Sequence, residues 1–322
     1  MAIQNHKVSV VIPAYRVSQQ ILSVVSSIGS EVAQIIVVDD CCPEKSGDLV
    51  KNNSSDGRVK VVFHEKNLGV GAAMITGYQI AIASGAEIIV KVDGDGQMNG
   101  SLIASLLDPI LKGRADYAKG NRFFDIEALK NMPKIRILGN LVLSFFAKIS
   151  TGYWQIFDPN NGFTAVHISA LKRIPLYKVS KRYFFESDML FRLNLARAVV
   201  VDVPMEAVYA DEKSNLSISR TFIEFQFKHA RNFIKRIAYS YYLRDFTLAS
   251  IELLAGVLLL TTGLISAIFN WINSAQLNQA TPTGTLILIA MLILSGMQLL
   301  LSFTSYDMQS APKDPISGQP KI

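Results

Sequence analysis

The chain has 322 residues, 50% of them hydrophobic, and its 32 basic and 26 acidic residues give a formal net charge of +6 at pH 7. Such a hydrophobic content is unusual for a soluble enzyme, and the length suits one domain of about 200 residues with additional segments. The two cysteines, Cys41 and Cys42, are adjacent, which excludes a disulfide framework and suits a reducing compartment. The N-terminus shows no apolar core region, so no cleaved signal peptide is expected.

Apolar runs and helical segments alternate in the first part of the chain. Buried strands are expected at residues 8–15, 34–40, 59–63 and 87–93. Helices are expected between them, at residues 19–29, 47–52 and 69–84. This alternation predicts a mostly parallel sheet with helices on both faces. Such sheets bind ligands at the carboxyl ends of their strands, where Pro13, Asp40 and Asp93 lie, so one cleft is expected to hold these residues together.

Residues 91–97 combine acidic, glycine and amide residues at the end of the fourth expected strand. Asp93, Asp95 and Gln97 are two residues apart and point to the same side of an extended segment, so they could converge on one hard cation. The glycines between them let the backbone turn sharply and approach a ligand closely. Taken alone, the same residues are also typical of an ordinary turn after a strand.

Two long apolar runs lie near the C-terminus, at residues 248–271 and 284–306. Each is close to the ~20 residues that cross a bilayer as a helix, and a buried core hairpin is the alternative. The connection between the runs has no lysine or arginine, whereas basic residues precede the first run and follow the second. The positive-inside rule therefore predicts two transmembrane helices whose flanks both face the cytoplasm.

Aromatic and basic residues are interleaved at residues 220–244, just before the first apolar run. This composition suits a helix in the headgroup region of an anionic membrane, and the adjoining spans make nucleic acid a poor alternative partner. A third apolar stretch, at residues 135–149, is too short to span a membrane. It is expected to belong to the core or to form a second helix at the membrane surface.

Four motifs together resemble those of family 2 inverting glycosyltransferases with the GT-A fold. They are found at residues 11–15 (VIPAY), 37–40 (VVDD), 67–72 (NLGVGA) and 93–97 (DGDGQ). Within that family the chain is similar to dolichol-phosphate mannose synthases and to bacterial polyprenyl-phosphate glycosyltransferases that end in paired membrane helices. The resemblance implies an α/β fold of the GT-A (nucleotide-diphospho-sugar transferase) class. It would have a mixed, mostly parallel sheet, helices on both faces and two C-terminal transmembrane helices.

The motifs and the apolar runs together divide the chain into four parts. We expect a cytoplasmic GT-A catalytic domain at residues 1–219 and an amphipathic juxtamembrane helix region at residues 220–245. Two transmembrane helices with a short outward loop would follow at residues 246–306, and a cytoplasmic tail at residues 307–322. The protein is thus expected to be an integral protein of the cytoplasmic (inner) membrane. Its two short spans would allow protomers to pair in a homo-oligomer.

Carried over residue by residue, the resemblance implies a site for a UDP- or GDP-sugar donor. The implied donor-binding residues are Pro13, Tyr15, Val38, Asp40, Gly71, Ala72, Asp93 and Asp95. Asp93, Asp95 and Gln97 would hold Mg²⁺ or Mn²⁺ on the donor diphosphate, where the cation neutralises the leaving group. Asp95 is therefore expected to serve the chemical step. The sequence leaves the sugar open among glucose, mannose, galactose and N-acetylglucosamine.

The resemblance also implies residues for the acceptor. The implied ligands of an acceptor phosphate are Arg122, Arg136, Lys213 and Ser214. Asp158 would lie near the sugar and the acceptor, although an Asn-Gly turn explains the same segment. Glu186 and Asp188 occupy the place of the base that deprotonates an acceptor hydroxyl in many family members, but the segment departs from the usual Glu-Asp pattern. A lipid phosphate is already mostly ionised at neutral pH and needs no such base.

The function expected from these residues is metal-dependent, inverting transfer of a sugar from a nucleotide-sugar to polyprenyl phosphate at the cytoplasmic membrane face. One alternative is transfer to a hydroxyl of a lipid-linked glycan or surface polysaccharide, with Asp188 or Glu186 as the base. A second alternative is an inactive nucleotide-sugar-binding scaffold, against which the complete set of metal ligands argues. No nucleic-acid partner is expected.

Overall fold

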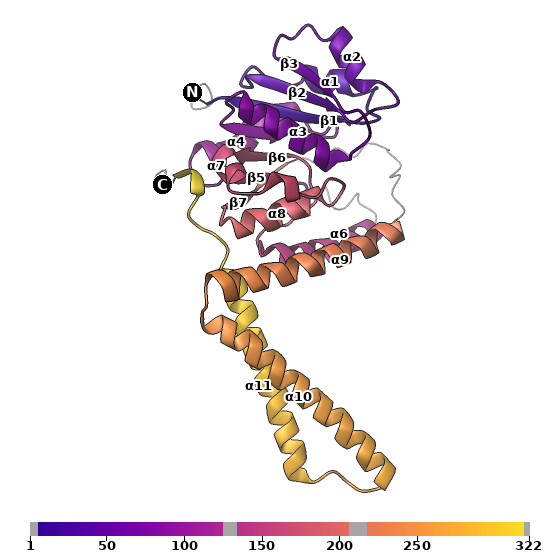
Figure 1. The fold of residues 1–322 in the computed structure, drawn as a ribbon, viewed down its shortest axis with the longest axis vertical. Coiled ribbons are helices and arrows are strands. Elements are labelled where there is room, and N and C mark those ends of the chain that lie inside the picture. The colour runs from indigo at the N-terminus through magenta and orange to yellow at the C-terminus, as the bar shows by residue number, and fades with distance from the viewer. Residues whose placement is uncertain (1–5, 125–133, 206–217, 319–322) are drawn as a thin grey trace. The chain divides into compact units, whose positions relative to one another are not determined.

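The computed structural model describes residues 6–124, 134–205 and 218–318, which form two compact units (Figure 1). The first unit comprises residues 1–233 and 312–322, and the second comprises residues 234–311. The strands of the first unit are β1 (Val8–Ala14), β2 (Gln34–Asp39), β3 (Val59–Phe63), β4 (Ile88–Lys91), β5 (Tyr117–Asn121), β6 (Thr164–His167) and β7 (Val200–Pro204). Its helices are α1 (Ile21–Ser26), α2 (Ser46–Asn53), α3 (Val70–Ala83), α4 (Ile103–Leu111), α6 (Lys134–Thr151), α7 (Ile168–Lys172), α8 (Phe185–Leu195) and most of α9 (Ile218–Ile237).

The seven strands form one sheet in the order β3-β2-β1-β4-β6-β5-β7. Neighbouring strands are parallel except that β6 is antiparallel to both β4 and β5. The central strands are rich in valine and isoleucine and are buried on both faces, as is usual for parallel strands covered by helices. The structure therefore confirms the predicted mixed, mostly parallel sheet.

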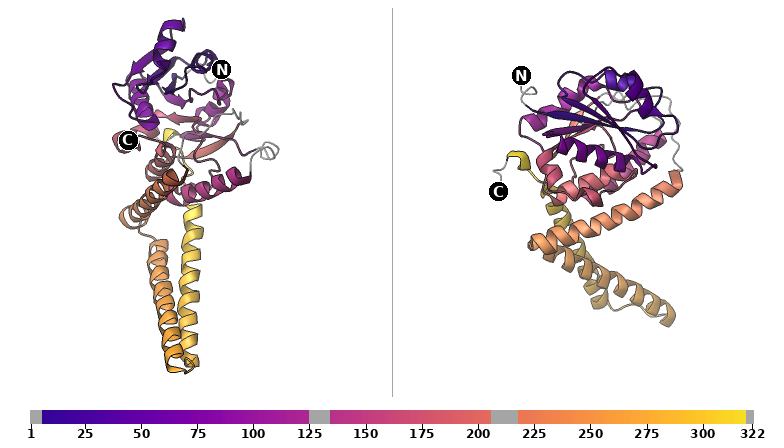
Figure 2. Two further views of the ribbon diagram at one scale, coloured as in Figure 1. Left: turned by 90° about the vertical axis from the view of Figure 1, so that its right-hand side faces the viewer. Right: turned by 45° about the horizontal axis from the view of Figure 1, so that its top comes forward.

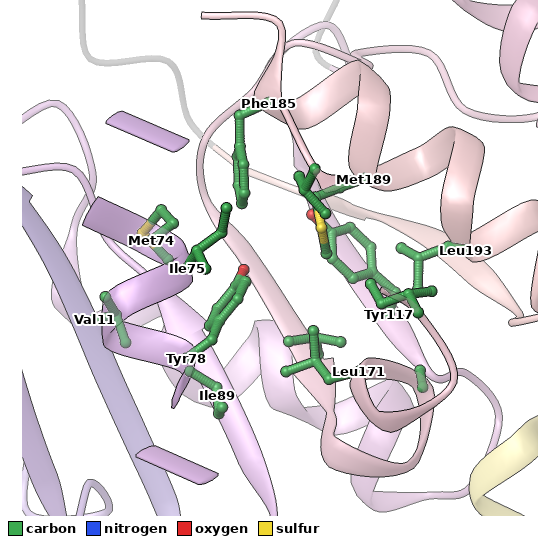
Figure 3. Packing of buried hydrophobic residues seen from close by; sticks show 14 of the residues in the cluster. Val11, Met74, Ile75, Tyr78, Ile89, Tyr117, Leu171, Phe185, Met189 and Leu193 are labelled. Atoms are coloured by element: carbon green, nitrogen blue, oxygen red, sulfur yellow. The ribbon is translucent and has the colours of Figure 1, made fainter. Parts of the chain in front are cut away.

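Helices lie on both faces of this sheet, as the alternation of strands and helices predicts (Figure 2). A hydrophobic core lies on each face. On one face, side chains of α3, α7 and α8 pack on the strands, among them Tyr78, Leu171 and Met189 (Figure 3). On the other face, α1, α2 and α4 supply the apolar side chains. Burial of apolar surface on both faces is the main term that stabilises such a three-layer unit.

The register of the strands brings their polar ends together. Strand β1 lies between β2 and β4, and Ala14 of β1 is paired with Asp39 of β2. On the other side, Val11 of β1 is paired with Lys91, the last residue of β4. Because the three strands run parallel, the segments that follow them all leave from one edge of the sheet.

Helices α6 and α9 both expose apolar side chains. On α6, Leu141 is 50% exposed and Phe145 54% exposed, so the expected apolar stretch at residues 135–149 forms a helix that is not simply part of the core. On α9, Ile223 is 57% exposed and Phe227 74% exposed. Other side chains of the two helices meet, since the Ser150 hydroxyl and His229 Nδ1 are 2.7 Å apart.

The second unit contains a π-helical turn (Ala238–Arg244) and the helices α10 (Leu248–Leu277) and α11 (Thr283–Gln309), which run side by side (Figure 1). Both long helices are long and apolar enough to cross a membrane. The Ser302 hydroxyl donates to the Glu252 carboxylate across the pair at 2.9 Å. Near the start of α10 and the end of α11, Arg236 forms two hydrogen bonds to the buried Asp307 carboxylate, at 2.6 and 3.0 Å.

The chain returns to the first unit after α11. Residues 316–318 form a short 3₁₀ turn, and Ile316 is buried in the core beside α7. The backbone amides of Ile316 and Ser317 both donate to the carboxylate of Asp116, each at 2.8 Å. Both ends of the second unit are therefore joined to the first unit.

Candidate active site

A pocket of about 790 Å³ opens at the carboxyl ends of the strands in the first unit. It is lined by residues that follow β1, β2 and β4, by the turn before α3, by the loop before β6 and by the segment that leads into α8. The lining residues include Pro13, Tyr15, Asp40, Gly69, Lys91, Asp93, Asp95, Leu143, Asn160, Gly162, Arg182, Tyr183, Glu186 and Phe225. The pocket brings Pro13, Asp40 and Asp93 together, as their positions at strand ends predict.

Asp93 and Asp95 lie on the turn that follows β4, and both line the pocket. The turn is shaped by local hydrogen bonds. The amide of Gln97 donates to Asp95 Oδ1 at 3.0 Å, and the amide of Asp93 donates to the sulfur of Met98 at 3.2 Å. Gly96 has a φ of +77°, in the left-handed region that glycine adopts without strain.

The residues present fit a divalent cation that is shared with a substrate. Among the residues that the structure describes, no cluster of three or more His, Cys, Asp or Glu side chains could hold a metal ion. The pocket itself offers two hard oxygen ligands, Asp93 and Asp95. Mg²⁺ is commonly bound in this way, through one or two carboxylates together with water and substrate phosphates. Gln97, the third ligand expected from the sequence, does not line the described pocket.

Lys91 is an important residue of the site that the sequence motifs did not identify. Its side chain is buried, and its ammonium lies 2.8 Å from Asp93 Oδ1 and 2.8 Å from Glu186 Oε1. Burial alone would lower the pKa of Lys91, but the two neighbouring carboxylates raise it above its ordinary value. Lys91 therefore remains charged and links Asp93 to Glu186.

Gly162 leaves the space that this ion-pair cluster needs. A Cβ atom at position 162 would overlap Asp93 Oδ2 and Lys91 Nζ. The glycine belongs to the Asn161-Gly162 pair that the sequence also explains as a turn. In the structure its close approach to two charged groups gives a second reason why a side chain is excluded there.

Asp40, at the end of β2, lines the pocket but is strongly bound within the fold. Its Oδ1 atom lies 2.7 Å from His64 Nδ1 and accepts the amide of Leu68 at 2.9 Å. Its Oδ2 atom accepts the amide of Gly69 at 2.7 Å. Asp40 thus fixes the turn before α3 at the wall of the pocket. A contact between Asp40 and the donor base stays a prediction.

A second polar cluster lies beside the pocket. Asp158 is buried and accepts two hydrogen bonds from Arg122, at 2.8 and 3.2 Å. Lys119 on β5 is fully buried and donates to the backbone carbonyl of Asn161, and burial lowers its pKa to about 8. Burial raises the pKa of the neighbouring Asp202 carboxyl to about 6. Arg122 and Asp158 do not line the described pocket, so their assignment to acceptor and sugar stays a prediction.

The two candidate bases occupy different environments on α8. Glu186 lines the pocket and is paired with Lys91. Asp188 is 5% exposed and does not line the described pocket. Its carboxylate accepts the amide of Ser180 at 2.9 Å, Nε of Arg192 at 3.1 Å and Nδ2 of Asn232 at 3.1 Å. Each carboxylate therefore has a cationic partner, Lys91 for Glu186 and Arg192 for Asp188.

Several residues expected in the site lie elsewhere. Val38 is fully buried in the core, and Gly71 and Ala72 are buried on α3 against the segment that precedes α8. These three described residues do not line the pocket, so contacts between them and the donor stay predictions. Arg136 belongs to α6, but its side chain is not described, and Lys213 and Ser214 lie outside the described residues.

The pocket is also lined by Arg182, Tyr183 and the apolar residues Leu143 and Phe225. The sequence patterns assign no role in the site to Arg182 or Leu143. Leu143 comes from α6 and Phe225 from α9, the helices that expose apolar side chains. The interleaved aromatic and basic residues at 220–244 predict a membrane-surface helix in the region of α9. It contained no signal that one of its aromatic rings would reach the pocket.

Comparison with known proteins identifies the relatives of this chain. It is 32% identical over 215 residues to UDP-N-acetylglucosamine–dolichyl-phosphate N-acetylglucosaminyltransferase of Methanococcus voltae, covering 62% of this chain and 85% of the relative. It is 29% identical over 201 residues to polyprenol monophosphomannose synthase of Mycolicibacterium smegmatis, covering 61% of this chain and 75% of the relative.

Solved structures show the same fold. The crystal structure of glucosyl-3-phosphoglycerate synthase from Mycobacterium tuberculosis with uridine diphosphate matches with a TM-score of 0.53 at 18% identity, over 73% of this chain and 81% of that one. This likeness in fold confirms the predicted GT-A class. The model of the family described as Glycosyl transferase family 2 matches residues 9–175. The chain is therefore a glycosyltransferase and belongs to glycosyl transferase family 2.

Proposed function

We propose that the protein transfers a sugar from a nucleotide-sugar donor to polyprenyl phosphate, with inversion at the anomeric carbon. The observation that carries this proposal is the pairing of the acidic residues that could act as a base. Glu186 is paired with Lys91, Asp188 with Arg192 and Asp158 with Arg122. A hydroxyl acceptor needs a general base, whereas a phosphate acceptor is already mostly ionised near pH 7. The site therefore favours a phosphate acceptor.

The donor is proposed to lie along the edge of the sheet, with its diphosphate beside Asp93 and Asp95. A divalent cation, Mg²⁺ or Mn²⁺, would there neutralise the charge that develops on the leaving nucleoside diphosphate. Asp93 and Asp95 would hold this cation, and Lys91 keeps Asp93 oriented through their 2.8 Å ion pair. Pro13 and Tyr15 would contact the nucleoside, while Asp40 holds the pocket wall beside them.

A lipid acceptor is supported by the apolar part of the pocket and by the relatives. Leu143 and Phe225 line the pocket, and the two helices that carry them expose apolar side chains on the surface. The names of two relatives specify dolichyl phosphate and polyprenol monophosphomannose. The acceptor phosphate would thus enter the polar part of the pocket while the chain stays in apolar surroundings.

The membrane arrangement is proposed from the connections of the second unit. Both of its ends are joined to the first unit, and α10 and α11 are long enough to form a membrane hairpin. A hairpin with its two ends on one side of a bilayer satisfies these connections. The basic residues that flank the hairpin favour the cytoplasmic side for both ends. The catalytic unit would then act at the cytoplasmic face of the membrane.

The proposal is tested by offering radiolabelled UDP- and GDP-sugars, with Mn²⁺, to the full chain and undecaprenyl phosphate in detergent micelles. The matched controls are Asp95→Ala and Asp48→Ala, because Asp48 is an exposed aspartate on α2 outside the pocket. We expect a lipid-extractable product with at least one donor, lost in Asp95→Ala and retained in Asp48→Ala. Donor hydrolysis that depends on Mn²⁺ but yields no lipid product, or transfer only to a water-soluble sugar, would refute the phosphate acceptor.

A further inference from the structure

The segment that leads into α8 is hydrogen-bonded to the first turn of α3. The carbonyl of Lys181 accepts the amide of Ala72 at 3.0 Å, and the carbonyl of Arg182 accepts the amide of Phe185 at 2.9 Å. The amide of Ser180 donates to Asp188 Oδ2 at 2.9 Å. Backbone groups of residues 180–182 are therefore bonded to α3 on one side and to α8 on the other.

The glycines of the turn allow this close packing. A Cβ atom at Gly71 would overlap the carbonyl oxygen of Ser180. A Cβ atom at Gly69 would lie 2.5 Å from the carbonyl oxygen of Lys181 and 2.8 Å from Cγ of Arg182. Gly69 also has a φ of +98°, which side chains rarely tolerate, and Asp40 binds its amide from the other side. The aliphatic stem of Arg182 thus lies over Gly69 at the pocket wall.

Two described residues that line the pocket carry a positive charge, Lys91 and Arg182. Lys91 is buried and paired with Asp93 and Glu186. Arg182 is exposed, and within the described parts of the chain no carboxylate pairs with its guanidinium. A guanidinium is a planar donor that can form two hydrogen bonds to one phosphate group.

We propose that Arg182 binds a phosphate group of a substrate and that Asp188 is a positioning residue for the segment that carries Arg182. This inference rests on the proposed function, because it assigns Arg182 to a phosphate of that reaction. The phosphate belongs either to the donor diphosphate or to the lipid acceptor, and both present the same oxygens to the guanidinium.

The environment of Asp188 matches a positioning role. Its carboxylate binds Ser180 on the segment, Arg192 one turn further along α8, and Asn232 on α9. A residue that deprotonates an acceptor has to touch that acceptor, but Asp188 is buried behind Ser180 and does not line the described pocket. Loss of its carboxylate would remove one of the hydrogen bonds that hold the segment and would thereby shift the guanidinium of Arg182.

The first experiment compares Arg182→Gln with Arg173→Gln, since Arg173 is an exposed arginine of the same unit that does not line the pocket. Two quantities are measured, the Kd of UDP or GDP with Mn²⁺ by calorimetry and the KM of undecaprenyl phosphate in the transfer assay. Loss of a charge-assisted hydrogen bond weakens binding by about ten- to a hundredfold. We expect one of these constants to rise by that factor in Arg182→Gln, and Arg182→Lys to recover part of the loss.

The two constants separate the sources of the phosphate. A rise in the nucleotide Kd alone places Arg182 on the donor diphosphate, and a rise in the acceptor KM alone places it on the lipid phosphate. The proposal is overturned if both constants stay within twofold of those of the Arg173→Gln control. If the wild-type protein transfers no sugar to lipid phosphate, the proposed function fails. Calorimetry with UDP or GDP and with farnesyl phosphate then still decides whether Arg182 binds phosphate.

The positioning role of Asp188 is tested by a double-mutant cycle with Asp188→Asn and Arg182→Gln. If Asp188 acts through Arg182, each change raises the same constant, and the double variant is no worse than the more damaged single variant. Asn232→Leu, which leaves the carboxylate intact but removes one of its donors, should raise the same constant by a smaller factor. A fall in kcat at saturating substrate that is independent of residue 182, with loss of the acidic limb of the pH profile, would show that Asp188 is a base instead.

Discussion

The ends of β2 and β4 each carry two acidic residues, but the structure uses the two pairs differently. Asp39, the last residue of β2, accepts the amides of Cys42 and Gly47 at 2.7 and 2.6 Å and is 3% exposed. Its neighbour Asp40 accepts two more amides and lies against His64. After β4, Asp93 and Asp95 line the pocket. The carboxylate of Asp93 is paired with the ammonium of Lys91.

This difference shows how to distinguish a structural carboxylate from a reactive one at the edge of a parallel sheet. The amides bound by Asp39 belong to the loop and helix that follow it, so its carboxylate fixes the path of the chain. A carboxylate that satisfies several buried amides is not free to bind a substrate group. Substitutions at the two strand ends should therefore affect different properties of the protein.

The largest effect is expected for Asp95→Ala, which would remove a ligand from the proposed metal site. Transfer should fall by about a thousandfold, the scale of losing a group that stabilises charge in the transition state. The unfolding temperature in detergent should change little, because Asp95 lies in the pocket wall. Transfer rates and thermal unfolding of the same preparation measure both. If the Asp95→Ala protein unfolds near the assay temperature, Asp95 also stabilises the fold, and the proposed difference between the ends of β2 and β4 is wrong.

The converse change, Asp39→Ala, should act on stability. It leaves two buried amides without an acceptor, which costs about 2–4 kcal/mol in total. Chemical unfolding of the detergent-solubilised protein measures this loss, and Asp39→Asn should lose less because an amide oxygen still accepts a hydrogen bond. If Asp39→Ala keeps full stability but loses transfer activity, the end of β2 is reactive after all.

His229 is a buried titratable residue outside the pocket, and its protonation should affect the stability of the protein. It lies between Ser150 and the ring of Phe184, and burial lowers its pKa from 6.5 to about 4. The unfolded chain therefore binds this proton first as the pH falls, so the histidine destabilises the fold progressively between about pH 6.5 and pH 4. Between pH 7 and pH 5 the wild type should lose about 2 kcal/mol relative to His229→Gln.

The free energy of unfolding has to be compared between the wild type and His229→Gln, because the titration of Asp202 changes that free energy in the opposite direction. Its pKa is raised to about 6, so protonation of Asp202 stabilises the fold as the pH falls below that value. This contribution is common to both proteins and cancels in their difference. Unfolding curves whose separation does not change between pH 7 and pH 5 would contradict a buried, neutral His229.

The smallest effect is expected for Glu186→Gln, because Glu186 on α8 reaches the end of β4 only through its pairing with Lys91. Glutamine still offers an oxygen to Lys91 in place of the 2.8 Å ion pair, so kcat should fall by less than about tenfold. Steady-state transfer at saturating donor and lipid phosphate is the appropriate measurement. A general base typically contributes about 10²–10⁴-fold, and a loss of that size would favour a hydroxyl acceptor.

Much of the first unit could be predicted from local pattern. Valine- and isoleucine-rich runs marked the central strands, and their order with the helices implied which edge of the sheet would carry the site. The positions of Asp40 and Asp93 at the pocket follow from that reasoning. The two apolar runs near the C-terminus likewise predicted two continuous helices, which the structure extends to Leu248–Leu277 and Thr283–Gln309.

Contacts between distant segments account for what the sequence did not reveal. The partners Lys91 and Glu186 are 95 residues apart, and Ile316 meets Asp116 across 200 residues. The resemblance implies that Gly71 binds the donor, but a glycine indicates only that some group approaches closely and does not identify that group. In the structure the group that approaches Gly71 is the carbonyl of Ser180. No local pattern specifies such partners.

The central claim is that the sugar is transferred to a phosphate oxygen, and the linkage in the product tests it most directly. The lipid product made by the full chain from undecaprenyl phosphate would be examined by ³¹P and ¹H NMR. The account predicts a phosphodiester whose phosphorus is coupled to the anomeric proton, with the anomeric configuration opposite to that of the donor. A sugar attached to a hydroxyl, with the phosphate left as a monoester, would contradict it.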